Sequence, residues 1–280
     1  MHHTYYQHRD TMTIKFYAPL WGNNLAFESF CKQVKEAGYQ GVEMDLPQET
    51  KQKDLLLAIL KDHDLELVGQ YYQSFETDPK ANLNSYEKYL RHLIAANPVL
   101  INCQTGKDYF ALEENLPLFQ VAERLSKDSG IPITHETHRG KCLYAAPVAK
   151  QYFESLPNLR ICLDISHWCN VHESLLEDQK EIVDLAISRT DHIHSRVGHA
   201  EGPQVNDPRA PEWETALDAH LNWWGKVIEL HRNSDRDLTI CTEFGPYPYM
   251  PTFPYSEKPL ANQWEINVYM MNLLKNRFHI

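Results

Sequence analysis

Short runs of apolar and β-branched residues alternate along the chain with longer segments whose apolar residues keep helical spacing. This alternation is typical of strands followed by helices, and strict alternation predicts a parallel sheet. Eight such units predict that the sheet closes on itself, so the expected fold is α/β, a (β/α)8 TIM barrel. The strands are expected to begin near Ile14, Gly41, Leu65, Pro98, Ile131, Leu159, His192 and Leu238.

Glycines and a proline mark several expected helix ends. The helix that follows Asn24 is expected to stop at Gly38, because glycine is favoured just past the end of a helix. A later helix is expected to open at Asn115, with Pro117 early in its first turn, and to close at Gly130.

Length and composition favour one domain. The chain has 280 residues, 42% of them hydrophobic, and an eight-unit barrel needs roughly 250 residues. An open doubly wound sheet is the structural alternative, but no GxGxxG or GxxxxGK[ST] motif follows any expected strand. Residues 13–280 are therefore expected to form the barrel. The polar segment 1–12, MHHTYYQHRDTM, is expected to be a flexible leader.

The net charge, the apolar runs and the cysteines indicate which classes of partner and which cellular compartment to expect. The net charge is −11 and the sequence has no run of lysine and arginine residues, which argues against a nucleic-acid partner. No apolar stretch approaches the ~20 residues that cross a bilayer, so no membrane partner is expected. The six cysteines form no CxxC pair, which indicates reduced core thiols and a cytoplasmic protein.

Four polar residues stand where expected strands end. Each is in phase, at period two, with an earlier residue of its run, so all four are expected to point into the barrel at its carboxyl end. They are Glu136 after Thr134, Asp164 after Cys162, His194 after His192, and Glu243 after Cys241. The alternative is that buried polar groups only bond to loop backbone, which four converging residues make less attractive.

Two glutamates, one aspartate and one histidine form an oxygen-rich ligand set. It suits one Mn²⁺, Mg²⁺, Co²⁺ or Zn²⁺ ion with coordination positions left open, which indicates a catalytic site. An ion that chelates a carbonyl and the adjacent hydroxyl acidifies the carbon-bound proton and stabilises the enediolate. Glu136 and Glu243 could then carry the proton.

At these residues the chain resembles the xylose isomerase-like barrels, the sugar isomerase and epimerase group that includes inosose dehydratases and endonuclease IV. The most specific stretches are HETHRG at 135–140, LDISHW at 163–168 and HIHSRVGHAEGPQVNDPRAP at 192–211. The resemblance implies that Glu136, Asp164, His194 and Glu243 bind the metal. It also implies that Glu136 and Glu243 act as acid and base on opposite faces of a sugar or polyol, and that His167 binds a substrate oxygen.

Two positions depart from the ketose 3-epimerases of that group. Those enzymes carry a glutamate six residues after the first ligand and an arginine six residues after the histidine ligand. This chain has Cys142 and Ala200 there. The resemblance therefore implies a metal-dependent isomerase or epimerase without specifying 3-epimerisation.

Further side chains are expected around the substrate. His138 should lie on the rim, and Trp21 and Gln104 suit either a sugar or plain barrel packing. Arg196 should point inward, as a substrate clamp or in an ion pair with Asp164 or Glu43. Glu43 is expected beside the site as a structural or supporting carboxylate rather than a fifth ligand.

Three other functions stay open from the sequence. A dehydratase acting on an inosose or keto-sugar shares the enolate step and then loses water. A phosphodiesterase like endonuclease IV would use three zinc ions and further histidines, for which His192, His199 and His220 are available. A barrel that binds carbohydrate without catalysis would need no metal. A homo-oligomer is compatible with all of them.

Overall fold

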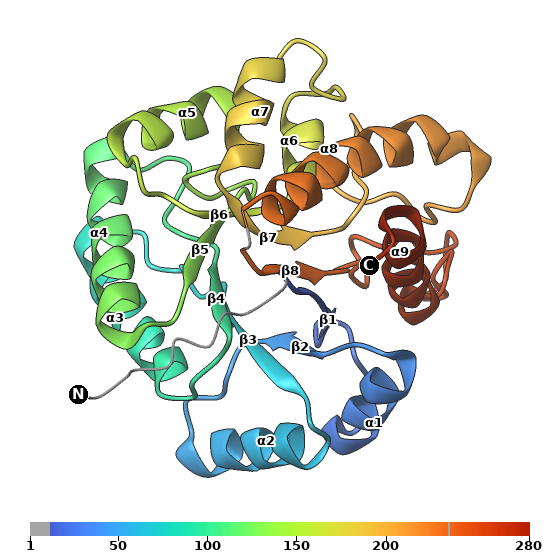
Figure 1. Ribbon diagram of the computed structural model, residues 1–280, viewed down its shortest axis with the longest axis horizontal. Helices are drawn as coiled ribbons and strands as arrows, with labels where there is room; N and C mark the ends of the chain where they lie inside the picture. The colour runs from blue at the N-terminus through green and yellow to red at the C-terminus, as the bar shows by residue number, and fades with distance from the viewer. Residues whose placement is uncertain (1–11, 235) are drawn as a thin grey trace, which may run out of the picture.

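The protein is a closed barrel of parallel strands surrounded by helices, in a computed structural model that describes residues 12–234 and 236–280 (Figure 1). Each strand pairs in parallel with the next along the chain, and the first pairs with the last, which closes the ring. The strands are β1 (Ile14–Pro19), β2 (Gly41–Met44), β3 (Glu66–Tyr71), β4 (Leu100–Cys103), β5 (Ile133–Glu136), β6 (Ile161–Leu163), β7 (Thr190–His194) and β8 (Leu238–Cys241). The predicted eight-stranded barrel is confirmed.

Helices follow the strands and lie outside the ring, as Figure 1 shows. They are α1 (Phe27–Ala37), α2 (Thr50–Asp62), α3 (Pro79–Ile94), α4 (Leu112–Ser129), α5 (Ala146–Ser155), α6 (Ile165–Val171), α7 (Lys180–Ser188), the 3-10 turn η1 (Pro211–Trp213), α8 (Glu214–Arg232) and α9 (Gln263–Phe278). The order departs from strict alternation where α6 and α7 both lie between β6 and β7, and where η1 precedes α8 between β7 and β8.

Two of the predicted helix ends are confirmed and one start is wrong. Gly38 and Gly130 end α1 and α4 in the left-handed conformation, with φ of 90° and 76°. The helix predicted to open at Asn115 instead begins at Leu112. The Glu114 carboxylate accepts from the backbone N–H of Ala111 at 2.8 Å and so satisfies the helix start one turn earlier. Asn115 is buried and its amide donates to the carbonyl of Lys107, holding the preceding loop.

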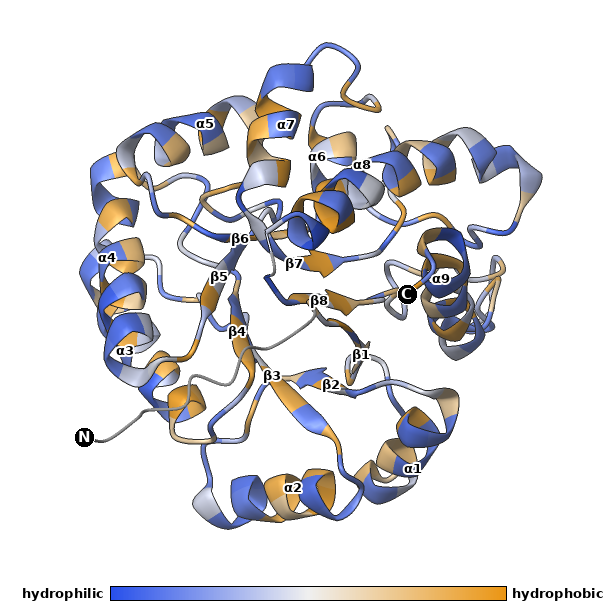
Figure 2. Ribbon diagram, in the orientation of Figure 1, coloured by the Kyte–Doolittle hydropathy of each residue, from blue (hydrophilic) through white to orange (hydrophobic). Residues whose placement is uncertain are grey.

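The main apolar core lies between the strands and the surrounding helices. Ile193 and Ile240 on the strands, and Trp224 and Val227 on α8, are fully buried there. Figure 2 shows orange and blue residues mixed along each outer helix, as expected for helices with one buried face. Several buried polar residues, among them Glu43 and His192, occupy the alternate positions of the strands.

Three further predictions concern the cysteines, membrane-spanning helices and the N-terminal leader. All six cysteines are free and buried, as predicted. Within the described part of the chain, no helix has the length and hydropathy that a membrane crossing requires. The predicted flexible leader lies, apart from Met12, outside the described residues.

Candidate metal centre

The structure brings together the four residues predicted to bind a metal. Glu136 and His194 are the last residues of β5 and β7, Asp164 directly follows β6, and Glu243 stands two residues after β8. All four are buried, and one ligand atom of each lies within 4.8 Å of the others. They meet at the carboxyl ends of the strands, where barrel enzymes place their chemistry.

Three atoms of this group are buried without a hydrogen-bond partner among the described residues: Glu136 Oε1, His194 Nδ1 and Glu243 Oε2. The Nδ1 atom lies 2.6 Å from Glu243 Oε2, 3.7 Å from Glu136 Oε1 and 3.8 Å from Asp164 Oδ2. Buried polar atoms normally have partners, and a divalent cation would satisfy all of these acceptors at once. The residues therefore fit a hard metal ion.

Each glutamate has its other oxygen held by an amide. Asn102 Nδ2 donates to Glu136 Oε2 at 3.0 Å, and Gln70 Nε2 donates to Glu243 Oε1 at 3.3 Å. The two amides fix both carboxylates, so that one oxygen of each faces the shared space. Supporting hydrogen bonds of this kind orient ligands and tune a metal.

Glu43 lies one layer deeper and contacts two histidines. Its Oε1 is 2.9 Å from His194 Nε2, and its Oε2 is 2.9 Å from His192 Nε2. A carboxylate acceptor here favours a proton on Nε2. Burial opposes ionisation of His194, but the surrounding anionic groups outweigh it and raise its pKa well above the ordinary value, so a bound ion would take the place of the Nδ1 proton. Burial opposes ionisation of Glu43, but His194 and His192 outweigh it and keep its pKa below the ordinary value.

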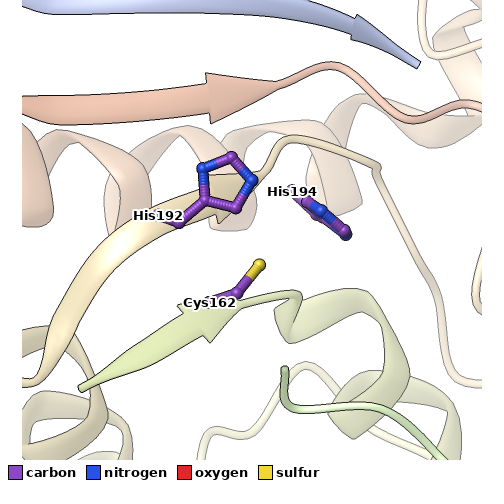
Figure 3. Close-up of side chains that lie close together, drawn as sticks. All are labelled: Cys162, His192 and His194. Atoms are coloured by element: carbon purple, nitrogen blue, oxygen red, sulfur yellow. The ribbon is translucent and has the colours of Figure 1, made fainter. Parts of the chain in front are cut away.

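A second cluster, of Cys162, His192 and His194, also has ligand atoms within 4.8 Å of one another (Figure 3). Thiol and imidazole groups suit zinc. However, the His192 ring already contacts the Thr239 hydroxyl through Nδ1 at 2.6 Å and Glu43 through Nε2. Burial also raises the pKa of Cys162 well above the ordinary value, which keeps it a neutral thiol. The carboxylate group is thus the better candidate for an ion.

Arg196 is the buried cation of the site. Its guanidinium bonds to Asp164, lies 3.5 Å from Glu243 Oε2, and packs 4.8 Å above the ring of Tyr249. Of the two ion-pair partners predicted for Arg196, the structure shows Asp164 and not Glu43. Burial opposes ionisation of Asp164, but Arg196 outweighs it and holds the pKa of Asp164 well below the ordinary value.

The environment of His167 differs from what the resemblance implies. Its Nε2 accepts from Arg196 Nη2 at 2.8 Å, and its ring packs at a tilt against the His138 ring, with the ring centroids 3.9 Å apart. It is fully buried, and it does not line the cavity that Arg196 and His138 line. In this arrangement Arg196, rather than a substrate oxygen, occupies its Nε2.

Glu243 reaches the centre through an unusual backbone. Its φ is 39°, in the left-handed region that non-glycine residues seldom adopt. Two side-chain amides clamp the residues that follow: Asn267 bonds to the N–H and carbonyl of Phe244, and Gln204 does the same for Gly245. Gly245 must lack a side chain, because a Cβ there would lie 2.2 Å from the Trp21 ring. Gln204 thus supports the loop that follows β8.

A cavity of about 420 Å³ opens above these residues. Among the predicted site residues, the ones that line it are Trp21, Gln104, Glu136, His138, Arg196 and Glu243. Glu43 does not line it, which places that carboxylate in a supporting position rather than against a substrate. Asp45, Gln70 and Tyr249 also line the cavity and were not predicted from the sequence. Asp45 and Gln70 lie just after or near the end of a strand, so a search for polar residues at strand ends could have found them.

Comparison with known proteins gives matches in fold and weak matches in sequence. No protein-family model matches the chain. An inosose dehydratase of Mesomycoplasma hyopneumoniae is 25% identical over 198 residues, which cover 63% of this chain and 64% of that protein. The match thus spans less than two thirds of the curated relative.

Solved structures agree over nearly the whole chain. The D-allulose 3-epimerase of Methylomonas sp., in complex with D-allulose, has a TM-score of 0.60 at 15% identity over 95% of this chain and 99% of that one. A xylose isomerase domain protein of Alicyclobacillus acidocaldarius has a TM-score of 0.59 at 13% identity, with the same coverage. Endonuclease IV of Thermus thermophilus has a TM-score of 0.57 at 12% identity, again over 95% and 99%. The resemblance to xylose isomerase-like barrels is thus confirmed for the fold, which by itself does not separate these activities.

The ligand set predicts the metal content. The purified protein should bind about one divalent ion per chain under metal-replete conditions. Asp164→Asn should weaken metal binding by more than ~10-fold, because it removes an anionic ligand. Loss of a residue that only supports a ligand costs about that much by itself. Metal analysis and competition with a chelating dye measure both, with the exposed Asp218→Asn as control. Three zinc ions per chain, or none, would contradict the assignment.

Glu43 and Glu136 should differ in their effects. A glutamine at position 43 has one acceptor oxygen for two imidazole N–H groups, so Glu43→Gln should weaken metal affinity by ~10–100-fold but leave one ion at saturation. Glu136→Gln removes a proposed ligand and should reduce both occupancy and turnover. Titration of both variants with Mn²⁺ tests this order. Equal losses of metal would show that Glu43 is itself a ligand.

Proposed function

We propose that the protein is a divalent-metal-dependent sugar isomerase or epimerase that transfers a proton at a carbon next to a carbonyl. The observation that carries the proposal is the pair Glu136 and Glu243. Both line the cavity, each has one oxygen fixed by an amide, and each turns its other oxygen toward the same space. They come from β5 and β8, three strands apart in the ring.

A bound divalent ion would polarise a substrate carbonyl and adjacent hydroxyl, which makes the carbon-bound proton between them more acidic. Glu136, Asp164, His194 Nδ1 and Glu243 would hold it. One glutamate then removes the proton, and the other delivers a proton to the opposite face or to the neighbouring carbon. Delivery to the same carbon gives epimerisation, and delivery to its neighbour gives aldose–ketose isomerisation.

The electrostatics of Glu136 suit a residue that gains and loses a proton. Burial raises its pKa to about 8, and Glu243 and Asp164 add to the rise against the opposing effect of His194. A cation bound beside it would favour the carboxylate form. Glu136 is therefore held where a change in nearby charge shifts its protonation, which is the property of an acid–base group.

A dehydratase is the second candidate, because the sequence relative is named inosose dehydratase. The same first proton removal would be followed by loss of a hydroxide from the adjacent carbon, protonated to water by the second acid. The product would then be lighter by one water, which mass spectrometry separates from an isomer. A sugar or polyol substrate, the cytoplasmic location and the oligomeric state stay predictions.

The further histidines that a phosphodiesterase with three metal ions would use as ligands already contact other groups of the protein. His192 contacts Glu43 and Thr239, and the two ring nitrogens of His220 contact the backbone of Gly198 and Ala216. His199 stacks on Trp213 at 4.6 Å. These contacts support one ion rather than three.

Glu243→Gln tests the two-carboxylate mechanism. The variant should still bind a turned-over sugar measurably but lose turnover by ~10²–10⁴-fold, because an amide cannot accept the proton. A sugar panel in D₂O with Mn²⁺ measures it, since wild-type turnover puts solvent deuterium into the sugar. The exposed Glu229→Gln should behave as wild type. If Glu243→Gln turned over the sugar at the wild-type rate, the two-carboxylate mechanism would be wrong. If the hydrogen migrated within the sugar without exchange with solvent, a hydride shift would replace proton transfer as the mechanism.

A further inference from the structure

The mouth of the barrel has two chemically different halves. The ends of β5 to β8 supply the four candidate ligands. The ends of β1 to β4 supply cavity-lining residues of another kind: Trp21, Asp45, Gln70, Tyr72 and Gln104. If the reacting carbons lie at the ligands, as the proposed function requires, the rest of the substrate extends over this second half.

Asp45 is the charged group of the second half, and it is held in place. Gln73 Nε2 donates to Asp45 Oδ2 at 3.0 Å, while Gln73 Oε1 accepts from the backbone N–H of Tyr72 at 3.0 Å. Gln73 is itself nearly buried, so the carboxylate is fixed in the cavity wall. The structure gives this carboxylate an amide partner and no cation among the described residues.

The cationic side chains near the cavity already have hydrogen-bond partners. Arg196 is the cationic side chain among the described lining residues, and it bonds to Asp164 on the far half. The His138 ring contacts the Arg139 carbonyl through Nδ1 at 2.5 Å and packs against the His167 ring. On the same loop, Arg139 donates to Asn170 at 3.3 Å and Lys141 bonds to Ser74. A phosphate or carboxylate on the second half would face Asp45, and no lysine or arginine among the described residues lines that half of the cavity.

The same residues suit free hydroxyls. A carboxylate accepts hydroxyl hydrogens, and the amides of Gln70 and Gln104 can both donate and accept. The rings of Trp21 and Tyr72 offer apolar faces to the carbon-bound hydrogens of a sugar. A few polar groups set among aromatic faces are what fix a small polar ligand in a pocket of this size.

We infer that the protein takes an uncharged ketose or cyclic polyol, with free hydroxyls at the end remote from the reacting carbons, and that Asp45 excludes phosphorylated or carboxylated relatives. The inference rests on the proposed function for the direction in which the substrate lies. It adds the charge class of the substrate and names the residue that selects it.

Matched sugars test the inference on the full chain loaded with Mn²⁺. Free ketohexoses and their 6-phosphates, with D-fructose and D-fructose 6-phosphate as one pair, are compared by calorimetric binding and by deuterium uptake from D₂O. For the free ketohexose that binds most tightly, the wild-type protein should bind the free sugar at least ~10-fold more tightly than its 6-phosphate. The reason is that the negative phosphate would face the negative Asp45 carboxylate in a partly buried wall. Asp45→Asn should reduce that preference, and Asp45→Lys should reverse it.

Controls separate the possible failures. Metal stoichiometry shows that each variant is folded, and the exposed Asp62→Asn should keep the wild-type preference. If wild type binds and exchanges a phosphorylated sugar as well as the free one, the inference is overturned and the proposed function stands. If no sugar of either class binds or exchanges in metal-loaded protein, both are overturned. An unchanged preference in Asp45→Asn and Asp45→Lys would remove Asp45 as the selecting residue.

Discussion

The contact between Glu43 and His194 is the interaction on which the candidate centre depends. A carboxylate buried inside a barrel is costly unless it is paired, and here two imidazole nitrogens lie 2.9 Å from its two oxygens. The pairing orients the His194 ring and places its Nδ1 among three further carboxylates. The residue at the end of β2 thus determines what the end of β7 can bind, although Glu43 does not line the cavity.

Charge balance links this layer to the chemistry above it. Glu43, Glu136, Asp164 and Glu243 are buried together, and Arg196 is the arginine buried among them. Arg196 and the histidines hold the pKa of Asp164 below its ordinary value, whereas that of Glu136 is raised to about 8. The excess of negative charge explains why a divalent cation fits and why a proton is the alternative occupant.

The sequence predicted the parts of the site that follow from strand periodicity, and it missed the parts set by distant contacts. Glu136 and His194 end extended strands, so alternation placed them correctly. Glu243 lies beyond β8 with a φ of 39°, and its position depends on clamps from Asn267 and Gln204, which no local pattern connects to it. The start of α4 was missed for a similar reason: Asn115 has the side chain of a cap but is used to hold a loop.

The location of a bound ion tests the account most directly. Crystals grown with Mn²⁺ and measured near its absorption edge would give an anomalous difference map that identifies its neighbours. One peak is expected, within the ~2.0–2.3 Å typical of oxygen and nitrogen ligands, beside Glu136, Asp164, Glu243 and Nδ1 of His194. A peak beside Cys162 and His192, or contact with Nε2 of His194 in place of Glu43, would contradict it.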